Sequence, residues 1–377
     1  MKKFKWLNWM TVLACGWSVA FSLNFDNPLM QVSSVVIAIF GITIIHKRNI
    51  PIHNGIYVYA LFLIGGLLSS VINNSFDSKF VAYILVLPVA LFFNYLNEKE
   101  HHSVNYGLAL GGIIFGIISL YLFKDMFVYF GDDAGLRLDT TLNPNAIAYI
   151  VSMSALLLII KTPKLCLKSV FALIALAVLL ATRSKTGLGL YVISVFMIWL
   201  MSTKGKTNKL LLITISSLFL AMLAWINLDF IQQFFQIDTT RSLADGTGRT
   251  AGWNFLINRY LDSDLVQVLL GKGAGKANYD IQGMNTSAHN AWITIVYDFG
   301  LIGGVLQGLL VVVAMLNMEK KYYPLVLAAL IETMFEINYI GLGNIGSILY
   351  ISVLFKKGIV KPKSKQLFTN MKQQGEI

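Results

Sequence analysis

The chain has 377 residues, of which 56% are hydrophobic and only 13% are charged, so it carries more apolar surface than a soluble fold can bury. The sequence therefore predicts an all-α polytopic membrane protein, with residues 1–377 forming a single membrane domain. The formal net charge of +11 does not indicate nucleic-acid binding, because the basic residues lie at the ends of apolar runs and not in a patch with interleaved aromatic side chains.

Apolar runs of about 17 to 25 residues, long enough to cross ~30 Å of hydrocarbon, predict about twelve transmembrane helices. They lie near residues 5–22, 29–45, 56–72, 80–96, 103–123, 144–160, 166–182, 187–202, 209–227, 290–316, 322–338 and 341–355. Polar residues and glycines dilute the last two runs most. The glycine pairs Gly65-Gly66, Gly111-Gly112 and Gly303-Gly304 are typical of helices that pack closely in lipid.

The basic residues also predict the orientation of the chain. If residues 1–5 are cytoplasmic, most of the 30 lysines and arginines fall in cytoplasmic segments, as the positive-inside rule requires. Both termini are then cytoplasmic, and residues 228–289 form one long extracytoplasmic loop. Cys15 and Cys166 lie in or beside apolar runs, so no disulfide framework is indicated.

In this orientation the arginines separate from the lysines. Arg48 is cytoplasmic, and the others lie outside: Arg137, Arg183, Arg241, Arg249 and Arg259. Arginine presents a planar fork of donors that suits phosphate oxygens, so this distribution indicates an anion bound at the outer face. The alternative is that these arginines pair with loop aspartates, namely Asp132, Asp133, Asp139, Asp238, Asp245, Asp262 or Asp264.

Two of the outer arginines lie beside predicted helix starts. Arg183 and Lys185 precede the run at 187–202, whose free amides would face the same anion. In the alternative interpretation, Ser184 or Thr186 is an ordinary N-cap and the two basic side chains lie among lipid headgroups. Arg137 precedes Asn143-Pro144, a pair typical of a helix cap and first turn.

The long loop contains an amphipathic pattern. The apolar residues recur at helical spacing after Arg249: Trp253, Leu256, Ile257, Tyr260 and Leu261. They predict a helix with one apolar face, lying on the outer leaflet or over a cavity. The glycines before it permit a tight turn that places Arg249 at the helix start.

Two other segments of the loop imitate known motifs. Residues 271–276 contain three glycines and two lysines but lack the spacing of a phosphate loop, so they predict a flexible turn. Asp262 and Asp264 imitate a metal-binding D-x-D motif and predict a solvated loop.

His289 is the histidine predicted to lie outside. With Asn290 it opens an apolar run on the same side of the membrane as most of the arginines. An imidazole can accept a proton near neutral pH, so His289 is the candidate general base. A histidine at a membrane interface can equally be a polar anchor.

These residues carry a family resemblance. His289-Asn290 and, after nine intervening residues, Gly300-Leu-Ile-Gly303 resemble the H-[NSQ]-x9-G-x-x-G signature of the O-antigen ligase and O-antigen polymerase superfamily. Asp298 falls where that family commonly has an acid. The Asn-Pro-Asn after Arg137, the Thr182-Arg183-Ser184 turn, and Arg249 followed by Trp253 are similar to the family's other marks, in its order. Thr182 departs from the more usual serine.

The resemblance implies a GT-C-like glycosyltransferase in the bacterial cytoplasmic membrane that takes a glycan from undecaprenyl diphosphate at the extracytoplasmic face. It implies that Arg183, Arg249 and Arg137 bind the diphosphate and that His289 is the base, with Asn290 and Lys185 in support. No metal or other cofactor is required, and the anomeric configuration inverts.

The acceptor is left open between two cases. A polymerase of O-antigen or exopolysaccharide repeat units uses another lipid-linked glycan, which the lean outer loops favour, and a chain-length regulator would be its further partner. A ligase uses a lipid A core, and an O-linked oligosaccharyltransferase belongs to the same alternative.

Two acids lie within the run at 322–338. Glu332 and Glu336 are costly in lipid and require partners, so we expect one of them to pair with a diphosphate-binding arginine or to orient His289. With Asp298, they also favour an alternative of a different class, a transporter of lipid-linked glycan. A transporter should show repeats and midplane charges, whereas the basic residues here lie at the outer boundary.

Overall fold

The structure, a computed structural model, describes residues 2–24, 28–45, 51–122, 143–202, 249–282, 288–335 and 340–356. Throughout these ranges the regular structure is helical and contains no strand. The helices before the long loop are α1 (Lys2–Leu23), α2 (Pro28–Ile45), α3 (Asn54–Ile72), α4 (Ser78–Tyr95), α5 (Glu98–Leu122), α6 (Pro144–Lys161), α7 (Leu165–Thr182) and α8 (Lys185–Ser202).

The remaining helices follow the long loop or lie within it. They are α11 (Arg249–Leu261), α12 (Leu265–Leu270), α13 (Lys276–Ile281), α14 (Ala291–Asn317), the 3-10 turn η4 (Lys320–Tyr322), α15 (Tyr323–Phe335) and α16 (Ile345–Leu354). Each of the other predicted spans contains a helix, while the span at 209–227 lies outside the described residues, as do Arg137 and Glu336.

Six described helices are long and apolar enough to cross a membrane: α3, α5, α6, α7, α8 and α14. Their outward side chains are apolar as well. On α14 these side chains recur at helical spacing along one exposed stripe: Leu301, Val305, Leu309, Val312 and Leu316. A soluble fold would bury such a stripe, so the predicted class, an all-α membrane protein, agrees with this structure.

The last predicted span differs from the expectation. Helix α16 has 10 residues, which correspond to about 15 Å at 1.5 Å per residue, so by itself it does not reach the ~30 Å of a full span. Helix α15 is described as far as Phe335, and the span predicted at 322–338 stays a prediction. The cause at α16 is local: Gly341 and Gly343 are not helical, and the Asn344 side chain caps the helix by accepting from the Ser347 amide at 2.9 Å.

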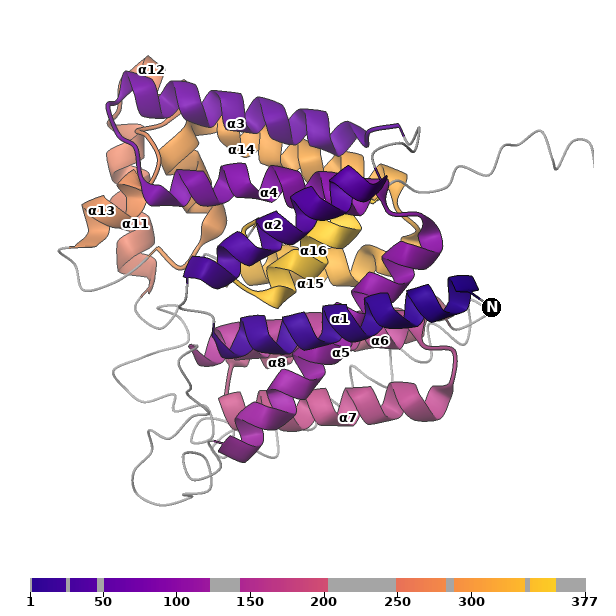
Figure 1. Ribbon diagram of the computed structural model, residues 1–377. Coiled ribbons are helices and arrows are strands. Elements are labelled where there is room, and N and C mark those ends of the chain that lie inside the picture. The colour runs from indigo at the N-terminus through magenta and orange to yellow at the C-terminus, as the bar shows by residue number, and fades with distance from the viewer. Residues whose placement is uncertain are drawn as a thin grey trace, which may run out of the picture.

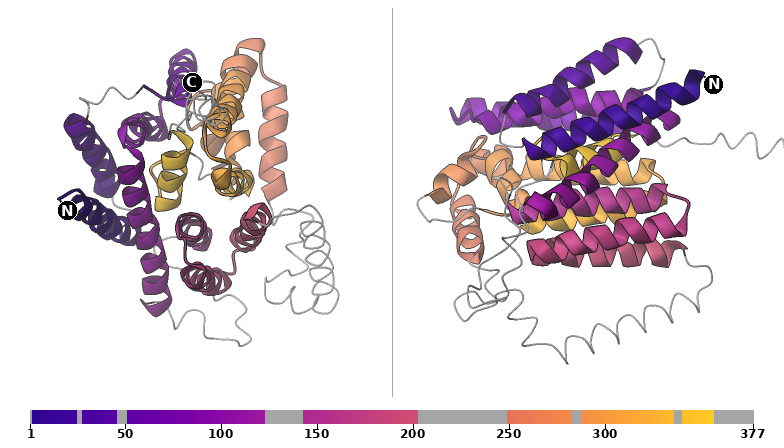
Figure 2. Two further views of the ribbon diagram at one scale, coloured as in Figure 1. Left: turned by 90° about the vertical axis from the view of Figure 1, so that its right-hand side faces the viewer. Right: turned by 60° about the horizontal axis from the view of Figure 1, so that its bottom comes forward.

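The helices run roughly side by side, and the short helices α11, α12 and α13 gather at one end of the bundle (Figure 1). We call this the loop end. Helices α6 and α16 are the most enclosed: all ten residues of α16 are buried, and α16 lies near the centre where several helices are seen end-on (Figure 2, left). Around them, α1 packs on α5, α3 on α14, and α6 on both α5 and α7.

The opposite end of the bundle is held by polar contacts between helix ends. The buried His101 ring places Nε2 2.8 Å from the carbonyl oxygen of Ser352 in α16. The Lys356 ammonium, just after α16, donates to the carbonyl of Leu96. Asn97 and Glu100 cap each other's backbone amides at 3.0 and 3.1 Å. These contacts fix α16 against the ends of α4 and α5.

The surroundings of the glycines show which of the predicted glycine pairs pack closely against another helix. A Cβ at Gly111 would lie 2.5 Å from Ser18 Cβ and 2.6 Å from the Cys15 carbonyl, so the predicted close packing is confirmed there, between α5 and α1. At Gly66 a Cβ would lie 2.7 Å from the Phe80 ring, whereas at Gly65 nothing lies within 4 Å. Close packing is therefore wrong for Gly65.

We expect Gly111→Ala to destabilise the protein by about 1–3 kcal/mol, because the backbone of α1 must move to admit the methyl group. Gly65→Ala is the matched control and should leave stability unchanged or slightly raised, since its site is open. Thermal unfolding of both variants in detergent compares them. Equal midpoints would contradict the close contact between α1 and α5.

Candidate functional site

The predicted amphipathic helix is present as α11, which begins at Arg249. Its buried residue Leu256 belongs to a small core that the loop shares with the start of α14: Leu256, Ala277, Ile281, Ala288 and Tyr297. Ile257 and Leu261 are exposed, so the apolar residues predicted for this helix divide between the small core and the surface. The helix packs on α12, α13 and α14.

Two hydrogen bonds from α11 place the candidate residues. The Arg249 guanidinium Nη1 donates to the carbonyl of Phe335, the last residue of α15. One turn later, the Trp253 indole Nε1 donates to the carbonyl of Ala288, which directly precedes His289. Residues at i and i+4 share one helix face, so the same face of α11 brings Arg249 and His289 into one neighbourhood.

His289 occupies a tight connection before α14. Its φ of 39° lies in the left-handed region that non-glycine residues rarely adopt, and its side chain is half-buried. Asn290 is the N-cap of α14: its side chain accepts from the Ile293 amide at 3.0 Å, and its carbonyl accepts from the Thr294 hydroxyl at 2.9 Å. Within the motif, Asn290 therefore fixes the start of α14 directly after His289.

The first turn of α14 is tied to the end of α15. The Trp292 indole Nε1 donates to the Thr333 hydroxyl at 3.0 Å. Glu332, the preceding residue, is fully buried and interacts electrostatically with Tyr149 of α6. Arg249 reaches Phe335, one turn further along α15. The predicted pairing of Glu332 with an arginine or with His289 stays a prediction, and Trp292 and Thr333 are contacts that the sequence did not indicate.

The turn between α7 and α8 alternates buried and half-exposed residues. Thr182 and Ser184 are buried, whereas Arg183 and Lys185 are half-exposed. The Ser184 hydroxyl accepts from the Gly187 amide at 3.2 Å, so the N-cap reading is confirmed. Arg183 is the C-cap of α7, with φ 48° and ψ 28°. This turn directs two cations away from the core, and an anion bound by them stays a prediction.

The α7–α8 turn lies at the same end of the bundle as Arg249. Helices α8 and α15 pack together, and the Ser194 hydroxyl donates to the Pro324 carbonyl at 3.4 Å. The two helices are antiparallel (Figures 1 and 2). Along α8, Lys185 lies about 14 Å before Ser194, and along α15, Thr333 lies about 14 Å after Pro324, at 1.5 Å per residue. Lys185 and Thr333 are therefore at the same level of the bundle. Arg183, Lys185 and Arg249 therefore share the loop end.

The glycine-rich segment 271–276 is fixed, so the prediction of a flexible turn is wrong. The Asp298 carboxylate accepts from the amides of Gly275 at 2.9 Å and Ala277 at 2.7 Å. The Asp298 carbonyl accepts from the Gly273 amide and from the Ser69 hydroxyl, both at 2.9 Å. A buried carboxylate that receives two backbone amides holds the segment against α3 and α14.

Gly300 allows the backbone of the 269–271 segment to lie directly against the backbone of α14. It has φ 68° and ψ −174° inside α14, which kinks there, and a Cβ on it would overlap the carbonyl of Leu269. Gly271, with φ 83°, would in turn overlap the backbone of Asp298. Gly300, the first glycine of the motif, is therefore required structurally, because two backbones cross at this point.

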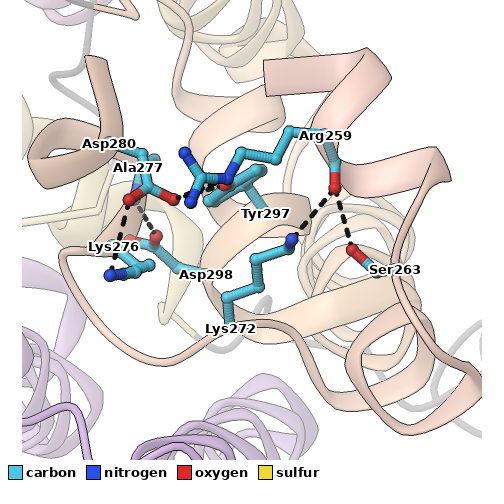
Figure 3. Close-up of polar contacts among 8 residues, drawn as sticks. All are labelled: Arg259, Ser263, Lys272, Lys276, Ala277, Asp280, Tyr297 and Asp298. Atoms are coloured by element: carbon cyan, nitrogen blue, oxygen red, sulfur yellow. Dashed lines mark hydrogen bonds and ion pairs between the residues drawn. The ribbon is translucent and has the colours of Figure 1, made fainter. Parts of the chain in front are cut away.

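A second buried acid joins α11, α13 and α14. Asp280 accepts from the Tyr297 hydroxyl at 2.5 Å and forms ion pairs with Arg259 at 3.5 Å and Lys276 at 3.4 Å. Figure 3 shows these contacts beside Lys272, whose ammonium donates to the Arg259 carbonyl at 2.9 Å. Burial and the nearby Arg259 lower the pKa of Lys272. Arg259 therefore pairs with an aspartate, as in the alternative interpretation, although the partner is Asp280 and not one of the aspartates named from the sequence.

In the part of the chain that the structure describes, no group of three or more His, Cys, Asp or Glu side chains could hold a metal ion. In the D-x-D segment, the Asp264 carboxylate accepts from the Gln267 amide at 2.9 Å and caps α12. The chemistry available at the loop end is therefore that of Arg183, Lys185, Arg249 and His289: cations for an anion, and an imidazole for a proton.

A comparison with models of protein families finds no match to this chain, and a search of curated proteins finds none either. The resemblance to O-antigen ligases and polymerases therefore depends on the motif residues alone.

Proposed function

We propose that this protein is a membrane glycosyltransferase that transfers an oligosaccharide from undecaprenyl diphosphate to a glycan acceptor at the outer face of the bacterial cytoplasmic membrane. The observation that carries the proposal is the pair of hydrogen bonds from α11, Arg249 to Phe335 and Trp253 to Ala288, which place an arginine and His289 together. The proposal includes about twelve spans, cytoplasmic termini and a GT-C-like arrangement.

The residues suit the chemistry of this transfer. As the acceptor hydroxyl attacks the anomeric carbon, His289 takes its proton, and the bond to the diphosphate oxygen breaks with its electron pair going to the leaving group. Arg249 and Arg183 stabilise the charge that develops on the diphosphate, with charge-assisted hydrogen bonds of about 1.5–3 kcal/mol each. An in-line attack of this kind inverts the anomeric configuration.

Within this proposal, polymerisation of repeat units is favoured over ligation to lipid A core, because the described outer segments are short helices without a domain of their own. Deletion of the gene separates the two: single repeat units on the core indicate a polymerase, and none at all indicate a ligase.

A transporter of lipid-linked glycan is the second candidate, because Glu332 is buried inside the bundle and α16 is short. Asp298 does not favour it, since both carboxylate oxygens already accept backbone amides. Purified protein with lipid-linked repeat units in detergent discriminates, because transport has no meaning without a membrane. Growth or transfer of glycan supports the enzyme, and its absence under all acceptor conditions supports the transporter.

We expect Arg249→Lys and Arg183→Lys each to lower transfer roughly 10- to 100-fold, the equivalent of one lost charge-assisted hydrogen bond. Lysine retains the charge but cannot present two parallel donors to one phosphate. Transfer rates at saturating donor, with insertion verified by gel filtration, measure the effect.

Arg259→Lys provides the matched control, because Arg259 lies on the same helix as Arg249 but pairs with Asp280. It should retain nearly full activity. If Arg183→Lys and Arg249→Lys behave like this control, the two arginines are surface residues without a role at the diphosphate.

A further inference from the structure

Helix α12 is apolar and yet faces away from the protein. Its sequence is Leu-Val-Gln-Val-Leu-Leu, and none of its residues is buried. Together with the last residue of α11, its most exposed side chains form what we call the α12 surface: Leu261, Leu265, Val266 and Leu269, of which Leu261 and Leu265 are 70% and 72% exposed. Contiguous apolar surface of this kind marks an interaction site.

The α12 surface cannot turn inward, because its backbone is fixed. The carbonyl of Leu269 lies against Gly300 at the kink of α14. Two residues after Leu269, the Gly271 amide donates to the Gln267 carbonyl at 2.8 Å, and the Gly271 carbonyl accepts from the Asn73 side chain at 3.0 Å. Helix α12 therefore keeps this orientation as long as the segment stays bound to α3 and α14.

The α12 surface continues the apolar exterior of the spanning helices. Gly300, which contacts Leu269, is followed by Leu301, the first residue of the exposed apolar stripe on α14. The Tyr260 hydroxyl also approaches the backbone of Leu301. At the end of α3, which α12 contacts, Val71 and Ile72 are exposed as well. One apolar surface therefore runs from the spans onto α12.

Charged side chains of both signs border this surface, with the exposed Asp262 and Asp264 between Leu261 and Leu265 and cations on the loop side. The Arg259 side chain is half-exposed, and the Lys272 ammonium lies at its carbonyl. Long basic side chains beside apolar ones are typical of helices at a membrane interface, where the stem lies among acyl chains and the charge reaches the headgroups.

We propose that α12 and the last turn of α11 lie in the lipid leaflet at the loop end of the bundle, with Leu261, Leu265, Val266 and Leu269 among the acyl chains. The occupant of the α12 surface is lipid, because the surface is continuous with helices that are themselves apolar on the outside. This placement holds Arg249 at the depth of the headgroups. It does not depend on the proposed function, since a transporter would need the same contact.

Spin labelling of the full-length protein in phosphatidylcholine vesicles tests the placement. Cys15 and Cys166 are first replaced by alanine, and single labels are then introduced by Leu265→Cys and Val266→Cys. Val305→Cys on the α14 stripe is the lipid reference, and Gln282→Cys at the exposed end of α13 is the water reference. Oxygen concentrates among acyl chains and a nickel chelate stays in water, so the ratio of their collision rates reports depth.

We expect the oxygen-to-nickel ratio at 265 and 266 to match that at 305 and to exceed that at 282 several-fold. A ratio at 265 and 266 like that at 282 would place α12 in water and overturn the proposal. Low collision rates with both reagents would mean that a second copy of the chain covers the surface, which would overturn it equally.

Discussion

Replacing His289 by alanine is expected to lower glycan transfer about 10²- to 10⁴-fold, the range in which a general base contributes. The reason is positional. Trp253 holds the carbonyl before His289, Asn290 caps the helix after it, and Arg249 extends from the same face as Trp253. His289 thus has its backbone fixed on both sides, as a residue that must meet a bound substrate requires.

Transfer to a saturating acceptor in detergent measures this effect, with binding of the lipid-linked donor measured separately. The loss should appear in kcat, while donor binding, which the arginines provide, changes little. Asn290→Ala is the structural control: it removes the N-cap of α14, should cost about 1 kcal/mol of stability, and leaves the imidazole in place.

Full activity of His289→Ala would sink the assignment of the base. An equal loss in His289→Ala and Asn290→Ala would instead show that the helix start matters and the imidazole does not. The two variants therefore separate a chemical role of His289 from a purely structural one.

The helices could be predicted from the sequence because their causes are local. Asn143 and Pro144 predict the start of α6, and the structure confirms it: the Asn143 side chain accepts from the Asn145 amide at 2.9 Å, and Pro144 is the first helical residue. The apolar runs also predicted the other long helices to within a few residues. The short helices α12 and α13 were not predicted, and α16 is shorter than its apolar run because residues 341–344 are not helical.

The connections within the site could not be predicted, because they join residues far apart in the chain. Nothing near Arg249 indicates that its partner is the carbonyl of Phe335, since any residue can supply a carbonyl. The motif marked Gly300, but its reason, the crossing with Gly271, appears only in three dimensions. Asp280 gave one local signal, its i, i+4 spacing from Lys276.

Asp298 is the residue on which the position of the whole loop depends most. Its carboxylate satisfies the amides of Gly275 and Ala277 in a buried place, and an alanine there would leave both amides without an acceptor. A hydrogen bond to a charged group is worth about 1.5–3 kcal/mol, and an unsatisfied buried amide costs about 1–3 kcal/mol. Asp298→Ala should therefore release residues 271–282 from α14.

Hydrogen exchange measures this release. In Asp298→Ala the amides of residues 271–282 should exchange at least ~10-fold faster than in the wild type, as a loss of more than 1.4 kcal/mol requires, while those of α6 stay protected. Asp298→Asn keeps one acceptor and should be intermediate. Asp262→Ala, at an exposed position of the same loop, is the matched control and should change nothing.

Activity should follow the exchange, because the loop carries Arg249 and Trp253 and precedes His289. Gly300→Ala reaches the same state by another route, since its methyl group would overlap the carbonyl of Leu269 and force the two backbones apart. If Asp298→Ala lost transfer while residues 271–282 stayed protected, the carboxylate would act on the substrate or on a proton and not on the loop. Faster exchange with an equal loss of transfer in both variants requires the structural role. The spacing from His289 to Gly300 then serves to anchor α12 and α13.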